Sequence, residues 1–278
     1  MIEVVRMLLA RGANVNVQGG KYGTALQAAC AGEDTHRSMG IFRLLLERGA
    51  DVHARGGFYG NAWHAAAAQL ADSECQNDVL QQLLDLGVDI NDAGGKQHPT
   101  ALHAALALNS WMDHRWSARI EFLLHHGADA NLEAGTYASS LQLACAMQVD
   151  WHYFLTIPED RAIILLEHAD LDVNKQGGLF GSALQAAAWT GKARVVKILL
   201  NKGADVNMRG GKYGSPLNAA VLKGHYDIVE ILLDRGAKPD CHQFQEADEV
   251  WLQEVEVECG EEAVERYRLF WEGQKSCM

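Results

Sequence analysis

The sequence lacks most features of secreted, membrane-spanning and nucleic-acid-binding proteins. It holds 36 acidic and 24 basic residues, a formal net charge of −12, whereas binding to a nucleic-acid backbone favours a basic face. No apolar stretch approaches the roughly 20 residues that cross a bilayer. The N-terminal segment carries Glu3 and has no basic leader or cleavage-type run, unlike a signal peptide. We therefore expect no nucleic-acid partner and no membrane partner.

Paired cysteines are also missing. The chain has six cysteines, and none of them forms a C-x-x-C pair: Cys30, Cys75, Cys145, Cys241, Cys259 and Cys277. Scattered cysteines without an extracellular signal are typical of reduced thiols. We therefore expect an intracellular, cytoplasmic protein.

Motifs for catalysis and cofactor binding are absent as well. There is no G-x-S-x-G, no G-x-x-x-x-G-K-(S/T) and no constellation of paired carboxylates apart from the repeats described below. His125 and His126 are adjacent, so on a helix they point about 100° apart and cannot form the i, i+4 metal pair. Cys241-His242 has no partners at zinc spacing. The sequence predicts no enzyme, and we expect no cofactor, metal or small-molecule substrate.

The chain does contain one sequence motif that occurs six times. Four copies read Gly-Gly-x-aromatic-Gly followed by a short, mostly alanine-rich run, at residues 19–29, 56–66, 177–187 and 210–220. Two looser copies lie at residues 100–105 and 137–144. The equivalent positions recur every 33 to 43 residues: Leu26, Trp63, Leu102, Leu141, Leu184 and Leu217. Such a period predicts a solenoid, in which each unit buries its apolar face against its neighbours.

Each unit has the signals of two short helices. Thr24, Ser182 and Ser215 can cap a first helix by accepting a hydrogen bond from its first turn. The alanines that follow predict a thin helix that its neighbours can approach closely. A second helix has apolar residues at three- and four-residue spacing, as in Val195 and Leu199, and ends in Gly-Ala-Asp-Val-Asn.

These phrases together resemble the ankyrin repeat, over roughly residues 1–240. Alanine replaces the usual proline in most copies, and the turn is Gly-Gly-x-aromatic-Gly, as in ankyrin arrays of filamentous fungi that are often attached to NACHT-type NTPase domains. The resemblance implies an all-α solenoid that binds a protein partner through its concave face without catalysis. The alternative function is that of a regulatory or sensor fragment of a larger NACHT-type NTPase protein.

The predicted domains are an array over residues 1–240, with a half-repeat at 1–18 and about six repeats after it, and an acidic amphipathic helical tail at 241–278. The half-repeat is either a cap or the sign of a fragment, and its Val4, Val5, Leu8 and Leu9 are expected to pack inward. The tail is either a C-terminal cap or a mobile acidic recognition element.

Two sets of aromatic residues are candidate protein-binding sites. One ring per turn forms a predicted ladder: Tyr22, Tyr59, Tyr137, Phe180 and Tyr213. The second set lies in two insertions between first and second helices: Trp111, Trp116 and Trp151. In both sets, the rings either pack against their neighbours or present rigid contact area to a partner, and the two roles are compatible for the ladder.

A polar ladder accompanies the aromatic one. One repeat position holds an amide or an imidazole in every copy: Gln27, His64, His103, Gln142, Gln185 and Asn218. A general base or metal ligand would not tolerate that exchange. We therefore predict side-chain hydrogen bonds to the backbone of the turns.

Overall fold

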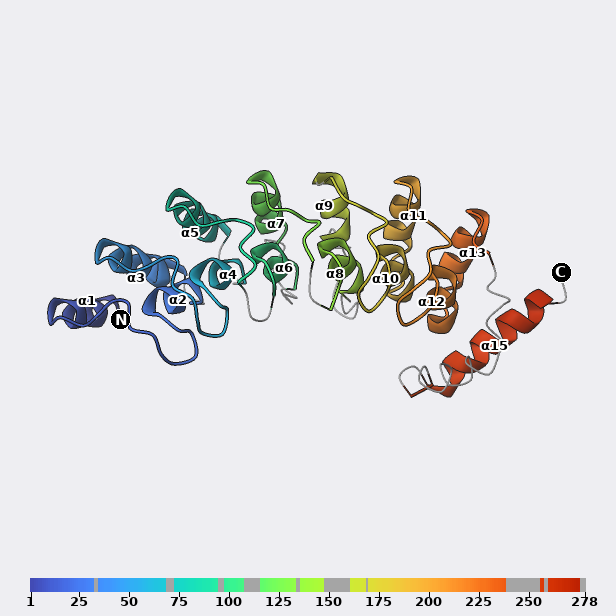
Figure 1. The fold of residues 1–278 in the computed structure, drawn as a ribbon, viewed down its shortest axis with the longest axis horizontal. Helices are drawn as coiled ribbons and strands as arrows, with labels where there is room; N and C mark the ends of the chain where they lie inside the picture. The colour runs from blue at the N-terminus through green and yellow to red at the C-terminus, as the bar shows by residue number, and fades with distance from the viewer. Residues whose placement is uncertain are drawn as a thin grey trace. The chain divides into compact units, whose positions relative to one another are not determined.

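The computed structural model describes residues 1–32, 35–68, 73–94, 98–107, 116–133, 136–147, 161–168, 170–238, 256–257 and 260–275. Over these residues the chain is helical, with isolated bridges in the turns and no strand (Figure 1). It divides into two compact units, residues 1–135 with 167–169, and residues 136–166 with 170–278. The predicted all-α class is therefore confirmed for the described residues.

Among the described residues, the first unit holds seven helices. They are α1 (Ile2–Ala10), α2 (Ala25–Cys30), α3 (Thr35–Glu47), α4 (Ala62–Ala67), α5 (Ser73–Asp85), α6 (Ala101–Leu106) and α7 (Trp116–His125). The short helices α2, α4 and α6 pack side by side, and each also packs on the longer helix that follows it. This is the helix–turn–helix stacking that the period predicted.

The second unit repeats the arrangement. Its helices are α8 (Ser140–Ala146), α9 (Arg161–His168), α10 (Ala183–Trp189), α11 (Ala193–Asn201), α12 (Pro216–Lys223), α13 (Tyr226–Asp234) and α15 (Glu261–Lys275). The first helices α8, α10 and α12 form one layer, and α9, α11 and α13 form the other (Figure 1).

Every first helix begins at a side-chain cap. Thr24, Ser182 and Ser215 accept from the backbone N–H three residues on, at 3.2 Å in each case, as predicted. Asn61 and Ser139 do the same, and Gln27 completes a capping box with Thr24. Because these residues are extended at the cap, the helix starts abruptly after the turn.

Within each of the two compact units, the core lies between the layer of first helices and the layer of second helices. The repeat leucines are at most 1% exposed, and Trp63 is fully buried in their place. The alanines beside them, such as Ala186 and Ala187, are also buried and let neighbouring first helices approach closely. Gly203 follows α11 with φ at 86°, and Ala204 N–H donates back to the Leu199 carbonyl at 3.0 Å, which confirms the left-handed helix end.

The N-terminal helix α1 differs from its expected packing. Val4 is 57% exposed and Leu8 53% exposed, and no residue of α1 is buried. The prediction that these side chains pack inward is therefore wrong for Val4 and Leu8. The reason is geometric: α1 has its main contacts with α3, whereas other second helices, such as α3 and α11, also pack on the first helix of their own repeat.

The described part of the tail packs on the array. Ala263, Val264, Tyr267 and Trp271 of α15 are buried, and α15 lies against α12. Arg266 donates to the Leu222 carbonyl near the end of α12, at 3.2 Å. Helix α15 is therefore in contact with the last repeat, while residues 241–255 lie outside the described residues.

Candidate functional site

The candidate site is built on glycine turns that close on themselves. In four turns the first glycine N–H donates to the carbonyl of the last glycine, for example Gly56 to Gly60 at 2.7 Å and Gly210 to Gly214 at 3.0 Å. The middle glycine has positive φ, 66° at Gly57 and 62° at Gly211. That conformation suits glycine because a side chain would strain it. Each turn is thus a rigid loop in front of a capped helix.

Adjacent turns also bind each other through the backbone. Phe58 N–H donates to the Lys21 carbonyl at 2.8 Å, and Lys212 N–H donates to the Leu179 carbonyl at the same distance. A methyl group on Gly57 would overlap the Tyr22 carbonyl, and one on Gly211 would overlap the backbone of Phe180. The Gly-Gly pair therefore permits one turn to lie directly on the preceding one.

In the first unit, this turn stacking brings aromatic rings together. The Tyr22 and Tyr59 rings are nearly parallel, 10° between planes and 6.3 Å between centroids. Phe58 meets the Tyr59 ring edge-on at 5.0 Å. The Lys21 ammonium lies 5.2 Å from the centres of both the Tyr22 and Phe58 rings. Three aromatic rings and one cation thus share a small surface at the turn tips.

In the second unit, the row is longer and includes a residue that the ladder did not predict. Tyr137 lies parallel to Phe180 at 6.4 Å, and Phe180 contacts Tyr213 at 5.7 Å. Trp189, at the end of α10, stacks on Tyr213 at 3.7 Å with 19° between ring planes. The Lys223 ammonium lies 4.2 Å above the Trp189 ring. The row therefore runs from Tyr137 to a cation–π pair.

The sequence did not predict a role for Trp189, because no aromatic residue recurs at its repeat position. The equivalent residues are small or aliphatic: Ala31, Ala68, Ala107, Ala146 and Leu222. One signal was available, since Trp189 is the only tryptophan at that position among the six copies. It is half-buried, so part of its ring is accessible.

Exposure divides the predicted ladder residues into two groups. Tyr22, Tyr59 and Tyr137 are half-buried, whereas Phe180 and Tyr213 are only 5% and 4% exposed. The first three can present a ring face to a partner, and the last two support the row from beneath. Trp111 and Trp151 lie outside the described residues, and so does the side chain of Trp116, the first residue of α7.

At several repeats, the polar ladder joins the first helix to the next turn. Gln27 donates to the Ala54 carbonyl at 2.9 Å, Gln185 to the Gly210 carbonyl at 2.9 Å, and Gln142 to the Gly177 carbonyl at 3.2 Å. His64 Nε2 pairs with the Pro99 carbonyl at 3.2 Å. The prediction of hydrogen bonds to turn backbone is confirmed at these positions. Their role is structural, and they place the turns.

Comparison with known families and structures identifies the architecture. A model of the ankyrin repeat matches residues 23–57, and a model of three ankyrin repeats matches residues 159–243. The fold is an ankyrin-repeat solenoid. Ankyrin repeats generally mediate protein–protein interaction and are generally non-catalytic.

Solved ankyrin domains share this fold at low sequence identity. The ankyrin repeat domain of human ASB11 is 22% identical, with a TM-score of 0.64, over 86% of this chain and 94% of that domain. The ankyrin repeat domain of Bcl-3, a member of the IkappaB family, is 20% identical, with a TM-score of 0.57, over 79% and 89%. No protein of curated function matches the chain by sequence.

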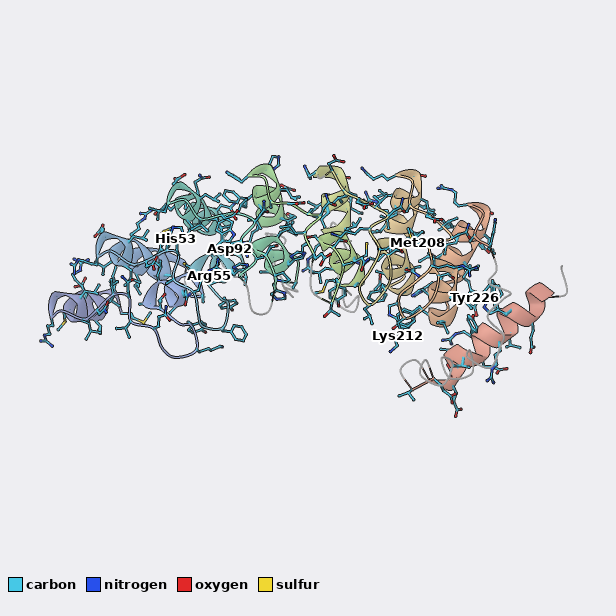
Figure 2. All side chains as sticks on the ribbon, in the orientation of Figure 1. His53, Arg55, Asp92, Met208, Lys212 and Tyr226 are labelled. Atoms are coloured by element: carbon cyan, nitrogen blue, oxygen red, sulfur yellow. The ribbon has the colours of Figure 1, made fainter. Side chains whose placement is uncertain are left out.

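Most described junctions between ankyrin units are fastened by an asparagine. Asn174 donates to the Gly203 carbonyl at 3.0 Å and accepts from Asp205 N–H at 2.8 Å. Asn16, Asn91 and Asn207 make the same pair of contacts to the next unit. His53 occupies the corresponding place in the second ankyrin unit (Figure 2).

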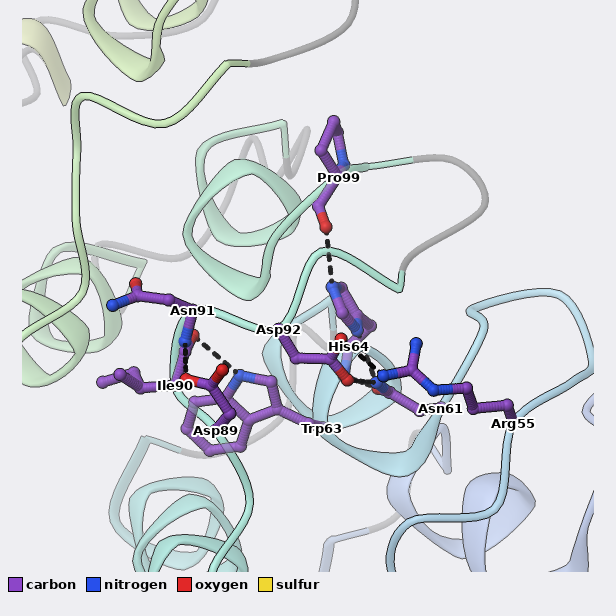
Figure 3. A network of polar contacts seen from close by, with 9 residues as sticks. All are labelled: Arg55, Asn61, Trp63, His64, Asp89, Ile90, Asn91, Asp92 and Pro99. Atoms are coloured by element: carbon purple, nitrogen blue, oxygen red, sulfur yellow. Dashed lines mark hydrogen bonds and ion pairs between the residues drawn. The ribbon is translucent and has the colours of Figure 1, made fainter.

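A different network fastens the junction at His53. Arg55 forms an ion pair with Asp92 at 2.8 Å, and Asn61 donates to the other oxygen of the Asp92 carboxylate at 2.8 Å (Figure 3). Trp63 donates its indole N–H to the Ile90 carbonyl at 3.3 Å. The network thus ties the turn and first helix of one ankyrin unit to the start of the next turn.

Three histidines lie around this junction. Burial is the main cause that lowers the pKa of His103 to about 4, and the nearby His98 and His64 contribute to the same shift. Burial also lowers the pKa of His64 and of His98. These imidazoles are therefore neutral at physiological pH. The described residues contain no group of three or more His, Cys, Asp or Glu side chains that could hold a metal ion.

No helix among the described residues is long and apolar enough to cross a membrane.

Proposed function

We propose that this ankyrin array binds a protein partner, without catalysis, through the face formed by its turns and first helices. The observation that carries the proposal is the stacking of aromatic rings at the turns within each of the two units. Tyr22, Tyr59, Tyr137 and Trp189 are half-buried, so each is fixed by packing and still offers part of its ring. Rigid aromatic side chains of this kind dominate binding energy at protein interfaces.

The backbone supports the same function. Because adjacent turns are bound to one another, the rings are held in place before a partner arrives. A partner therefore binds without the entropic cost of ordering flexible loops. The insertions that carry Trp111, Trp116 and Trp151 are proposed as a second part of the binding surface.

The test needs a partner identified by pull-down and then titrated against purified variants. Tyr59→Ala and Tyr137→Ala are each expected to weaken binding by about 1–3 kcal/mol, in the range of interface hot spots. Tyr226→Ala is the matched control, because Tyr226 lies on α13 and is 54% exposed (Figure 2). It should leave affinity unchanged.

Thermal melting of the same variants separates binding from packing. A loss of affinity that only follows a loss of stability would make the rings structural and refute the proposal. If both turn variants bind normally, the insertions around Trp111, Trp116 and Trp151 become the candidate surface instead.

A second candidate function rests on the turn sequence itself. The Gly-Gly-x-aromatic-Gly turns resemble those of ankyrin arrays attached to NACHT-type NTPase domains, and this resemblance favours the alternative of a sensor array in a larger protein of that kind. In that case, coding sequence upstream of Met1 should contain a further first helix and a nucleotide-binding domain. Full-length transcripts that encode no nucleotide-binding domain would rule out this second function.

A further inference from the structure

The second unit contains a basic region within an acidic chain. Residues 173–226 include eight lysines and arginines but a single acidic residue, Asp205, for a net charge of +7. The rest of the chain then carries −19. Such segregation of charge is a property of a surface and not of the core, because these charged side chains are exposed or half-buried. Charge of one sign on one surface favours an oppositely charged partner.

Part of this charge lies on the proposed binding face. Lys175, Arg209 and Lys212 belong to the two turns over residues 175–182 and 208–215, which contain no acidic residue. Arg209 is exposed, and Lys175 and Lys212 are half-buried. Figure 2 shows Lys212 on the side of α10 and α12 that lies away from α11.

The aromatic row ends in the same place. Tyr213 follows Lys212 directly, and Trp189 stacks on Tyr213 while Lys223 lies 4.2 Å above the indole. Arg209 and Lys212 belong to the turn that carries Tyr213, and Lys223 lies over the indole, so we define the basic patch as these three cations and Trp189. A half-buried tryptophan offers an apolar contact, and the cations around it offer partners for carboxylates.

We propose that this patch binds an acidic protein segment, with an apolar side chain of the segment on Trp189 and its carboxylates near Arg209, Lys212 and Lys223. The inference rests on the proposed function and adds the class of partner. The strongly negative remainder of the chain opposes a nucleic acid, whose phosphates extend well beyond a patch of this size. In a protein segment, by contrast, acidic residues can be confined to the part that contacts the patch.

The test selects partners from a random library of displayed 12-residue peptides, with the full chain as bait. Selected peptides should be enriched in Asp and Glu around an aromatic or aliphatic residue. The paired variant Arg209→Glu/Lys212→Glu should weaken the best peptide at least about tenfold and reduce the salt dependence of binding. Lys197→Glu/Lys202→Glu is the control, because it reverses the same charge on exposed positions of α11 and its end. It should change affinity less than about twofold.

A milder pair, Arg209→Gln/Lys212→Gln, and melting curves for every variant exclude unfolding as the cause. A labelled 20-nucleotide single strand, titrated in parallel, should bind more weakly than the best peptide. The inference is overturned if no peptide is enriched, if enriched peptides are not acidic, if both charge reversals act equally, or if the oligonucleotide binds more tightly.

The outcomes also separate this inference from the proposed function. Non-acidic peptides that lose affinity on Trp189→Ala would refute the acidic partner but retain binding through the turn face. Peptides that ignore Trp189→Ala, Tyr59→Ala and Tyr137→Ala alike would refute the proposed function itself.

Discussion

Helices α1 and α11 share the same pattern of apolar residues but have opposite environments. Val4, Val5 and Leu8 of α1 correspond to Val195, Val196 and Leu199 of α11. Val195 and Leu199 are 1% and 0% exposed, whereas Val4 and Leu8 are 57% and 53% exposed. The pattern of apolar residues thus fixes which face of a helix can be buried. Whether that face is buried depends on a neighbouring helix, and α1 has one fewer.

The turns and the polar ladder show the same dependence on neighbours. A methyl group on Gly211 would overlap the preceding turn, whereas Gly20, in the first turn, has nothing within 4 Å of that position. At the other end of the array, Gln185 binds the next turn, but the Asn218 side chain has no hydrogen-bond partner among the described residues. Residues at equivalent repeat positions are therefore expected to contribute differently to the free energy of unfolding at the ends of the array and in its interior.

The largest expected effect comes from truncating the two equivalent leucines. Leu199→Ala should lower the free energy of unfolding by about 2–5 kcal/mol, because it leaves a cavity in a closed core. Leu8→Ala should lower it by less than about 1 kcal/mol, because solvent already reaches Leu8. Urea unfolding of both variants measures the difference. Equal losses would mean that α1 is covered in solution by a neighbour.

Acidification should act on the interior of the first unit. His103 has an unfolded pKa near 6.5 and a folded pKa of about 4, so only the unfolded chain gains this proton between those values. Stability should therefore fall as the pH drops from 6.5 towards 4, by about 2–3 kcal/mol at most.

His103→Gln provides the matched control for the pH effect. Other repeats carry glutamine at this position and bind the next turn with it, as Gln27 and Gln185 do. The variant should fold and lose much of the pH dependence, and unfolding curves at pH 7 and 5 measure this. A wild-type stability that does not change over this range would show that His103 is not the buried, neutral group described above.

Much of this fold could be predicted from the sequence, because repetition compensates for weak local signals. Three helix starts were predicted correctly, at Thr24, Ser182 and Ser215, and so was the burial of Leu184. Each of these residues lies in the repeated motif. The environment of Val4 and Leu8 could not be predicted this way. Their residue types match the buried copies, and only the missing neighbour decides their exposure.

The candidate site was predicted in part for the same reason. The turn rings were found because one aromatic recurs per repeat, but the sequence did not show that Tyr213 is buried and Tyr137 half-buried. Trp189 has no counterpart in other copies, so its stacking on Tyr213 follows from side-chain direction in three dimensions and from no repeat pattern. Likewise, Arg55 and Asp92 are 37 residues apart, and only the fold pairs them.

A smaller difference is expected between two turn glycines. Gly20→Ala should cost about 1 kcal/mol, because alanine is strained at its φ of 64°. Gly211→Ala has the same strain at a φ of 62° and also overlaps the Phe180 backbone, so it should cost about 1–3 kcal/mol more. Thermal melting of both variants gives the comparison. A similar cost for the two would show that adjacent turns do not lie in direct contact.

Native-state hydrogen exchange tests most directly whether neighbours, and not helix sequence, set the stability of each repeat. In a solenoid each unit is stabilised mainly by its nearest neighbours, so a helix with fewer of them should open first. We expect the amides of residues 2–12 to exchange well before those of residues 182–236, although α1 and α11 have the same pattern of apolar residues. Equal protection in the two segments would contradict this explanation.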